Sequence, residues 1–341
     1  MMDTTQTDGW QQCDYISIEW IHSGRYNQFE SFLLKTIHPT GLNFENSKVT
    51  MLEDNNNFAS IRFDTWIEAF SCARKIDNWL FRGQSNSDWN LQSTLERDIS
   101  VNSGDTFMWN HCEQWMLRKF KGAAHHHIRH VPGEDDTIEW LALMQHHGAP
   151  TRLLDFTYSF AVSAYFAAKN AQSDFAIWAV NWLPLMKSVS ERLGLSDSVA
   201  KSSIKFHTKM HESANRYLRG EAKGALVFPV DPMRQNERSV SQQGLFLFPT
   251  DCARTFEQNL TCLYSDADIS HVNEKDFEIN YDPEVHNTNW FAHRMVVKFI
   301  LPKKERIKTI QDLDRINVHE ASLFPGLDGF ARSLKRFTLK D

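Results

Sequence analysis

The sequence predicts an α+β fold, with a mixed sheet at its core and helices around it. Segments with helical spacing of apolar residues are interspersed with short apolar runs, without the strict alternation that builds a parallel βαβ sheet. The 11 Trp and 24 Phe among 341 residues favour a packed body over disorder. A chain of this length can bury a large core, and no shift in composition marks a boundary between domains.

The first predicted elements follow an irregular N-terminal extension over residues 1–60, which contains the turn-forming stretches Gly41-Leu42-Asn43 and Asn55-Asn56-Asn57. Apolar residues at helical spacing predict a helix over Thr65–Lys75, with Asp64 as a candidate cap. A short apolar run predicts a strand over Trp79–Arg82. Helical spacing returns over Asp105–Lys121, which we expect to form a second helix.

The clearest helix is predicted over Asp136–His147. Asp136 and Glu139 have the spacing of a capping box, with Asp in place of the usual Ser or Thr. Gly148 and Pro150 follow the last turn and indicate where the helix ends.

The remaining elements are predicted from apolar spacing and from the Gly and Pro that bound them. We interpret the polar, mostly helical residues 188–219 as an insertion or lid. The other elements are a helix over Tyr158–Asn170, strands over Phe175–Trp182, Ala225–Val230, Gly244–Phe248 and Arg294–Leu301, and a short helix over Lys303–Ile310.

Composition and motifs exclude several functional classes. A net charge of −6 gives no whole-chain argument for nucleic acid, although a local basic groove stays open. Five Cys without a Cys-x-x-Cys pair favour a reducing cytoplasm over a disulfide framework or a zinc ribbon. No run of 18 apolar residues predicts a membrane span. No glycine-rich dinucleotide or P-loop motif occurs, and neither does a Gly-x-Ser-x-Gly elbow.

The stretch Met144–Asp155, MQHHGAPTRLLD, is the strongest candidate for part of a site, because it places titratable groups between two predicted helices. His146 is a candidate for contact with a ligand, although it could simply rest at the helix C-terminus. Arg152 and Asp155 are candidate ligand-binding residues, or they pair with each other and hold the loop.

The second candidate is Arg82-Gly83-Gln84, at the end of a predicted strand. The guanidinium of Arg82 can grip a phosphate or a ribose, and a backbone without a side chain at Gly83 lets the ligand approach. The alternative is a structural ion pair with an Asp.

Further polar residues complete the candidate set. The hydroxyls of Thr157 and Ser159 could cap the following helix or lie beside a ribose. Gln243 precedes a strand, and Glu320 stands in a short segment close to the C-terminus. The histidines within 125–130 lack the Glu of a zinc motif, so we predict no metal site.

These motifs resemble the FRG domain family, named for its Phe-Arg-Gly motif. The resemblance covers roughly residues 60–335 and implies an FRG domain over 61–335, with a helical insertion around 188–219 and a basic tail over 336–341. It is carried by Trp79–Gln84, Trp89–Leu91 with Arg97, Trp140–Asp155, Phe166-Ala167, Gln242–Phe246 and Ala321–Leu334.

The order of candidates also resembles ADP-ribosyltransferases of the Arg-Ser-Glu type, although more weakly. That resemblance implies a split sheet and NAD as co-substrate. Arg82 would bind the diphosphate or a ribose of NAD, Thr157 or Ser159 would position the nicotinamide ribose, and Glu320 would stabilise an oxocarbenium-like centre. The sequence departs from the pattern two residues before Glu320, where Val318 stands in place of Gln or Glu.

Three functions follow as expectations. The first is an NAD-dependent ADP-ribosyltransferase-like enzyme that modifies a protein or nucleic-acid acceptor, with a toxin or an anti-phage effector as the context that the resemblance implies. The second is a non-enzymatic module that binds a nucleotide or nucleic acid through Arg82, His146, Arg152 and the basic tail. The third is a metal-independent nuclease with His146 as general base.

Overall fold

A mixed sheet of eight strands lies at the centre of the residues that the structure describes. The computed structural model describes residues 58–102, 108–195, 203–232, 236–263, 278–292 and 294–338. The strands are β1 (Phe58–Arg62), β2 (Trp79–Gln84), β3 (Leu154–Thr157), β4 (Phe175–Asn181), β5 (Val227–Val230), β6 (Gly244–Pro249), β7 (Glu278–Asn280) and β8 (Val296–Leu301). They are hydrogen-bonded in the order β5-β6-β3-β2-β4-β8-β1-β7.

The sheet is antiparallel except at one end. β2 pairs with β4 along its whole length, from Trp79 opposite Asn181 to Gln84 opposite Ala176. At the far end, β1 runs parallel to both β7 and β8. This mixed sheet, with helices around it, confirms the predicted α+β class. The split arrangement of an ADP-ribosyltransferase stays a prediction.

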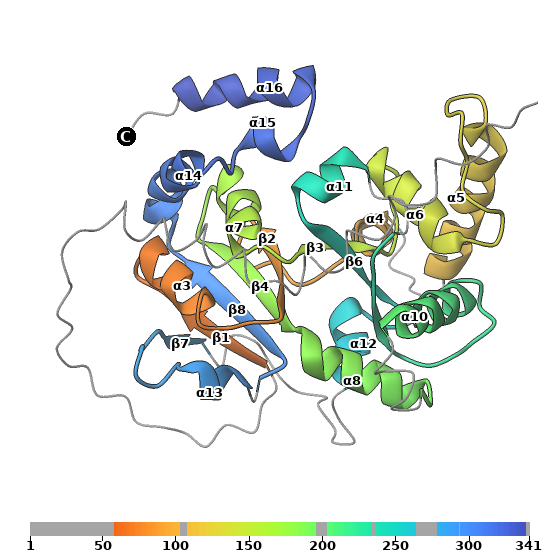
Figure 1. Cartoon of the computed structure of the whole chain (residues 1–341), viewed down its shortest axis with the longest axis horizontal. Helices are drawn as coiled ribbons and strands as arrows, with labels where there is room; N and C mark the ends of the chain where they lie inside the picture. The colour runs from red at the N-terminus through yellow and green to blue at the C-terminus, as the bar shows by residue number, and fades with distance from the viewer. Residues whose placement is uncertain are drawn as a thin grey trace, which may run out of the picture. The chain divides into compact units, whose positions relative to one another are not determined.

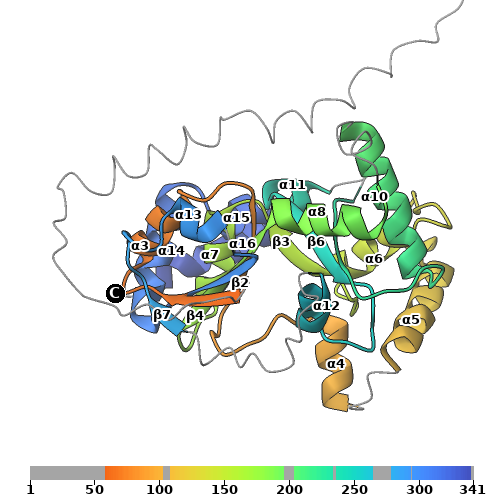
Figure 2. The same ribbon diagram turned by 90° about the horizontal axis from the view of Figure 1, so that it is seen from below.

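Helices surround the sheet, at both of its ends and, with α7, over its middle strands (Figures 1 and 2). They are α3 (Trp66–Ala73), α4 (Thr94–Asn102), α5 (Met108–Ala124), α6 (Thr137–His146), α7 (Phe160–Lys169), α8 (Trp182–Arg192), α10 (Ser203–Leu218), α11 (Glu237–Ser241), α12 (Phe256–Cys262), α13 (Thr288–Ala292), α14 (Arg306–Arg315), α15 (Glu320–Leu323) and α16 (Leu327–Ser333), with 3₁₀ helices η2 (Lys303–Glu305) and η3 (Leu334–Thr338). Helices α5, α6 and α10 lie at the β5–β6 end, and α3 and α14 lie at the β1–β7 end.

Local capping chemistry explains where several helices begin. The side chain of Asp136 accepts from the backbone N–H of Glu139, as predicted for the start of α6. Ser159 caps α7 by accepting from the N–H of Val162. At α3 the cap is Thr65, not the expected Asp64, because Thr65 forms a complete capping box with Glu68.

The structure places three strands where the spacing of apolar residues predicted none. Phe58–Arg62 forms β1, which crosses the expected boundary at residue 60, Leu154–Thr157 forms β3, and Glu278–Asn280 forms β7. The N-terminal extension up to residue 57 and the end of the basic tail, residues 339–341, lie outside the described residues.

Helix α10 and the end of α8 lie within residues 188–219, which the sequence suggested as an insertion or lid. The apolar faces of both helices nevertheless contribute to the main buried cluster, together with strands β5 and β6. The contributing residues are Leu185, Val189, Met210, Ala214 and Leu218. This packing fixes the two helices onto the body of the sheet.

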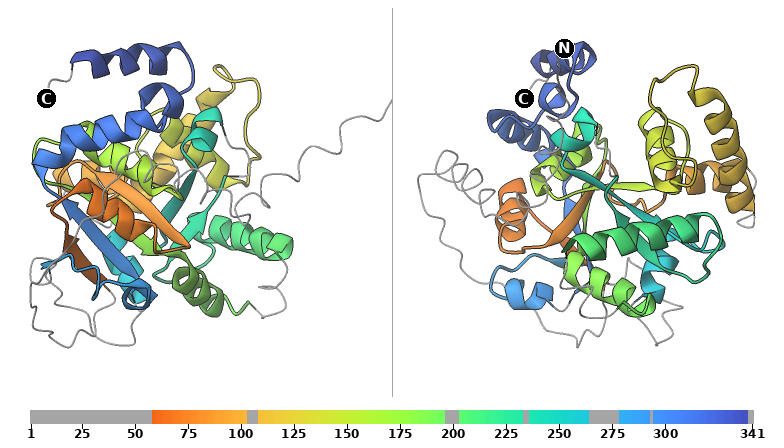
Figure 3. Two further views of the ribbon diagram at one scale, coloured as in Figure 1. Left: turned by 60° about the vertical axis from the view of Figure 1, so that its left-hand side comes forward. Right: turned by 45° about the vertical axis from the view of Figure 1, so that its right-hand side comes forward.

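Helix α7 packs directly on β2 at Gly83. A Cβ added at this glycine would overlap the carbonyl oxygen of Ser163 and lie 2.6 Å from the backbone nitrogen of Ala167. The close approach of a helix therefore requires glycine here. The approach of a ligand at Gly83 stays a prediction. The C-terminal helices α15 and α16, deep blue in Figure 3, lie beyond α14 and α7, away from the strands.

Candidate functional site

A cavity of about 870 Å³ opens where β2 and β3 meet the start of α7. Its wall also includes the loop that follows β2, helix α4, helix α11 and strand β6. Strand β2 supplies Phe81, Arg82, Gly83 and Gln84, so the Phe-Arg-Gly motif lies in the cavity wall. The size falls within the range of about 300–1,000 Å³ that is typical of small-molecule sites.

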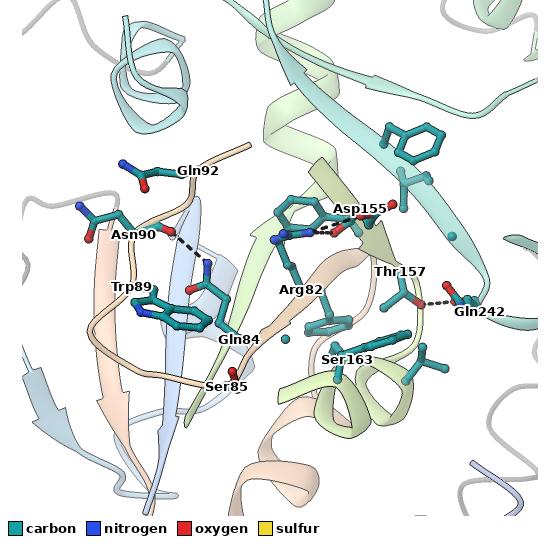
Figure 4. Close-up of a pocket in the computed structure, with 18 of the residues that line it drawn as sticks. Arg82, Gln84, Ser85, Trp89, Asn90, Gln92, Asp155, Thr157, Ser163 and Gln242 are labelled. Atoms are coloured by element: carbon teal, nitrogen blue, oxygen red, sulfur yellow. Dashed lines mark hydrogen bonds and ion pairs between the residues drawn. The ribbon is translucent and has the colours of Figure 1, made fainter. Parts of the chain in front are cut away.

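Arg82 lies in the middle of this cavity (Figure 4). Its Nη1 donates a 2.7 Å hydrogen bond to the backbone oxygen of Asp155 and lies 3.9 Å from the carboxylate of the same residue. Its buried Nε has no hydrogen-bond partner among the described residues. An unpaired buried N–H is rare, and an anionic ligand is one way to satisfy it.

The charge on Arg82 is only partly compensated. Burial is the main cause that lowers the pKa of its guanidinium, Arg97 lowers it further, and Asp155 raises it. The cavity wall carries three arginines, Arg82, Arg97 and Arg238, against two aspartates, Asp88 and Asp155. Within a chain of net negative charge, this local excess of cations favours an anionic ligand.

Gln84 is buried, and both polar atoms of its side-chain amide are hydrogen-bonded within the protein. Its side-chain oxygen accepts from Nε1 of Trp178 at 2.8 Å, and its amide nitrogen donates to the backbone oxygen of Asn90 at 2.9 Å. The amide therefore ties the loop after β2 to the neighbouring strand β4.

Thr157 lies on the opposite side of Arg82 from that loop (Figure 4). Its hydroxyl donates to the backbone oxygen of Gln242 at 2.7 Å and accepts from the N–H of Ser159 at 3.0 Å. Because the hydroxyl already has two partners, a ligand would meet it as a positioned, polarised group rather than a free donor.

One known protein family matches part of this chain. Residues 77–175 match the family model of the FRG domain. The chain carries an FRG domain over residues 77–175. No curated protein matches the chain, and neither does any solved structure.

The FRG match contains β2, β3 and α7, and with them 18 of the 24 residues that line the cavity. The other six residues lie beyond the match, on α11, on β6 and between these two elements. These include Arg238, Gln242 and Phe246. A complete cavity therefore needs chain on both sides of residue 175.

Five candidates predicted from the sequence line the cavity together: Arg82, Gly83, Gln84, Asp155 and Thr157. Five others do not line it. Three of these are accounted for by local structure. Ser159 caps α7, Gln243 has a positive φ of 49° in the turn before β6, and His146 ends α6.

His146 is held beside α11. Its Nδ1 lies 3.3 Å from the side-chain nitrogen of Asn236, the residue that caps α11. Burial is the main cause that lowers its pKa, and His147 and Arg238 lower it further. His146 thus supports the helix that carries Arg238 to the cavity.

Arg152 is buried away from the cavity, against α5. Its Nε donates to a carboxylate oxygen of Glu113 at 2.5 Å, and its Nη2 donates to Asn110 at 3.0 Å. Although burial lowers the pKa of Arg152, the adjacent Glu113 raises it above its ordinary value. From the sequence, we expected Arg152 either to bind a ligand or to pair with Asp155. The ion-pair partner of Arg152 is instead Glu113.

Glu320 also lies outside the residues that line the cavity. One oxygen accepts from the hydroxyl of Tyr165 and from Nζ of Lys169, both at 2.5 Å, and the other accepts from Arg332 at 2.8 Å. Burial opposes ionisation, but these three donors hold its pKa below the ordinary value. Among the described residues, the carboxylates of the cavity wall are instead Asp88 and the 68% exposed Asp155.

Several cavity residues were not selected as site residues from the sequence: Trp89, Asn90, Gln92, Arg97, Arg238 and Gln242. Trp89, Asn90, Arg97 and Gln242 stood in the segments that resemble the FRG family, and this resemblance was the signal that could have found them. No helix in the described part of the chain combines the length and apolar character needed to cross a membrane.

Proposed function

We propose that the cavity binds an NAD-type dinucleotide and that the chain is an ADP-ribosyltransferase-like enzyme. The observation that carries the proposal is the position of Arg82. It lies between two different ends of one cavity, with Trp89, Asn90 and Gln92 on one side and Thr157 and Gln242 on the other (Figure 4). A dinucleotide has this same order, with a diphosphate between two ribosides.

The groups around Arg82 suit the parts of such a ligand. The guanidinium of Arg82 suits a diphosphate, because Arg binds phosphate oxygens in a planar, bidentate geometry. Arg97 and Arg238 add positive charge at the wall. The side chains of Trp89, Asn90 and Gln92 suit a flat ring with polar edges, because they combine an aromatic face with amide groups.

The chemical step needs a carboxylate near the ribose. When the bond between C1′ of the ribose and the nicotinamide nitrogen breaks, the electron pair leaves with nicotinamide and positive charge develops on the ribose. We propose that Asp155 stabilises that charge, because it is one of two aspartates in the cavity wall and its carboxylate lies 3.9 Å from Nη1 of Arg82. The acceptor, a protein or a nucleic acid, would then attack C1′ and release its proton.

A second candidate function is nucleotide binding without catalysis. It is favoured by Glu320, because the carboxylate that the transferase resemblance requires has three donors around it and does not line the cavity. The nuclease alternative has less support, since His146 also lies outside the cavity wall. If the transferase function holds, consumption of NAD by a toxin or an anti-phage effector is the biological context that we propose.

Two measurements on the full chain test these functions. Calorimetric titration with NAD and with ADP-ribose measures binding, and chromatography of released nicotinamide measures cleavage. We expect binding by the wild type and its loss in Arg82→Ala, with Arg254→Ala as control because that exposed arginine pairs with Asp251 away from the cavity. Binding without nicotinamide release, even with cell lysate as a source of acceptor, would support the second function. No binding of either nucleotide would overturn both.

A further inference from the structure

The loop between β2 and α4 is fastened to the body of the protein along its backbone. The N–H of Ser87 donates to the backbone oxygen of Asp174 at 2.8 Å, and the N–H of Leu91 donates to the carboxylate of Glu257 at 2.8 Å. Within the loop, the N–H of Asp88 donates to the side-chain oxygen of Asn86 at 2.9 Å. The backbone on both sides of Trp89 is therefore anchored to other elements.

Buried side chains support the centre of the loop from beneath. Trp178 donates to Gln84, and Gln84 donates to the backbone oxygen of Asn90. Nζ of Lys298, which lies 4.4 Å from the centre of the Trp178 ring, donates to the backbone oxygen of Trp89 at 3.3 Å. Because a network of satisfied buried polar groups is rigid, it holds the Trp89 backbone in one place.

The side chain of Trp89 is nevertheless exposed. Trp89 lines the cavity and is 53% exposed as a residue, whereas Trp66, Trp79, Trp109, Trp140 and Trp178 are buried. Trp115, which is 59% exposed on α5 and does not line the cavity, is the other tryptophan exposed to a similar extent among the described residues. An anchored backbone that carries an open aromatic ring into a cavity is preorganised to receive a second flat ring.

The surroundings of Trp89 are polar in a way that suits the edge of a heterocycle. Asn90 and Gln92 line the same end of the cavity, on the same side of Arg82 as the indole (Figure 4). Arg97 donates to the backbone oxygen of Gln92 at 2.8 Å, which brings a cation to this end. An amide side chain can donate to or accept from the ring nitrogens of a base.

We infer that Trp89 is the platform on which the heteroaromatic ring of a bound nucleotide stacks, with Asn90 and Gln92 at the ring's edge. The inference rests on the proposed function, because the ligand is a nucleotide whose phosphate reaches Arg82. Two rings of a dinucleotide share this chemistry, adenine and nicotinamide. They are separated by probes that carry only one of them.

The test is a calorimetric titration of the full chain with ADP-ribose, with nicotinamide mononucleotide and with ribose 5-phosphate. For the probe whose ring stacks on Trp89, Trp89→Ala weakens binding about tenfold to a hundredfold, the effect of losing one stacked base. Trp89→Phe keeps most of the affinity, because an aromatic face remains. Trp115→Ala, the matched control, binds as the wild type does, and ribose 5-phosphate does not distinguish Trp89→Ala from the wild type.

Fluorescence gives a second readout that does not depend on affinity. Stacking on Trp89 quenches its indole emission, so the quench seen in the wild type with saturating ligand is lost in Trp89→Phe. Equal affinities of the wild type and Trp89→Ala for both ring-bearing probes, with the quench retained in Trp89→Phe, would overturn this inference and leave the proposed function standing. Absence of binding of all three probes to the wild type would overturn the proposed function, and this inference with it.

Discussion

The guanidinium of Arg82 donates a 2.7 Å hydrogen bond to the backbone carbonyl of Asp155. This bond joins the Phe-Arg-Gly motif to the last residue of the MQHHGAPTRLLD stretch, 73 positions along the chain. Because β2 and β3 are adjacent in the sheet, with Phe81 opposite Thr157, the two motifs share one cavity wall. The hydrogen bond to the backbone of β3 therefore fixes the orientation of the Arg82 guanidinium.

Replacing Arg82 with Lys tests whether ligand binding needs the planar guanidinium of Arg82 or only its positive charge. Arg82→Lys keeps the positive charge but cannot bond the Asp155 carbonyl and a phosphate through one planar group. We expect ADP-ribose to bind about tenfold more weakly, with little change in thermal stability, since the side chain is on the cavity wall. Calorimetry and thermal unfolding measure the two effects. Wild-type affinity in this variant would show that Arg82 acts only as a charge.

Gly83 and Gly122 form a matched pair of substitutions. At Gly83 an added Cβ would overlap the backbone of α7, so we expect Gly83→Ala to destabilise the fold by about 1–3 kcal/mol or more. At Gly122, in α5, nothing lies within 4 Å, so alanine should stabilise by up to about 1 kcal/mol. Urea unfolding compares them. A Gly83→Ala protein as stable as the wild type would mean that α7 can move away from β2.

The buried pair of Arg152 and Glu113 makes a prediction for stability rather than for binding. Arg152→Ala leaves the Glu113 carboxylate buried without its partner, which typically costs about 3–5 kcal/mol. The exposed pair of Arg254 and Asp251 is the control, and Arg254→Ala should cost less than about 1 kcal/mol. Urea unfolding measures both. If Arg152→Ala kept its stability but lost ADP-ribose, Arg152 would be a ligand-binding residue, as the sequence predicted.

Local chemistry made part of this protein predictable. Helix α6 begins at its cap Asp136, and β2 and β4 were found from their apolar runs, because caps and periodicity act over a few residues. Strand β3 was not found from its apolar run, because it has four residues and is recognised by its partners β2 and β6.

The site was predictable as a set of motifs but not as a geometry. Residues of α7 illustrate the reason, because neighbouring positions on a helix point about 100° apart. Ser163 and Phe166 face the cavity, whereas Tyr165 and Lys169 face Glu320. The order of residues along the chain contains no information on which face a distant carboxylate will meet.

Glu96 predicts how stability depends on pH. Burial raises the pKa of this carboxyl to about 7. In the unfolded chain it titrates near its ordinary pKa, so the folded state binds the extra proton between these two values and stability falls as pH rises through this window. Glu96→Gln mimics the protonated form. It should therefore gain stability over the wild type at pH 8, by about 3 kcal/mol at most.

The control for Glu96 is the same comparison at pH 4, where the wild type is also protonated. Thermal unfolding from pH 4 to pH 8 should show curves that nearly meet in acid and separate above neutrality. Curves that stay parallel across this range would mean that the carboxyl is ionised when folded and has a partner that offsets its burial.

Glu320 separates the structural role that its contacts indicate from the catalytic role that the transferase resemblance implies. Because donors from Lys169, Tyr165 and Arg332 lower its pKa, its contribution to stability is complete above the ordinary pKa of a Glu and is lost as pH falls through the lowered value. Glu320→Gln should therefore be less stable than the wild type at pH 7, and the difference should shrink in strong acid. Thermal unfolding of the wild type and of Glu320→Gln, at pH 7 and in strong acid, measures this difference in stability.

The rate of nicotinamide release tests which carboxylate, Asp155 or Glu320, has the catalytic role. If the chain releases nicotinamide from NAD, Asp155→Asn should lower the rate by about a hundredfold, because its carboxylate lies at the cavity beside Arg82. Glu320→Gln, measured well below its unfolding temperature, should stay within a few-fold of the wild type, since Tyr165 and Lys169 hold Glu320 on another face of α7. The reverse pattern, with Glu320→Gln inactive but folded and Asp155→Asn active, would return the catalytic carboxylate to Glu320. It would also require α15 to move toward the cavity when NAD binds.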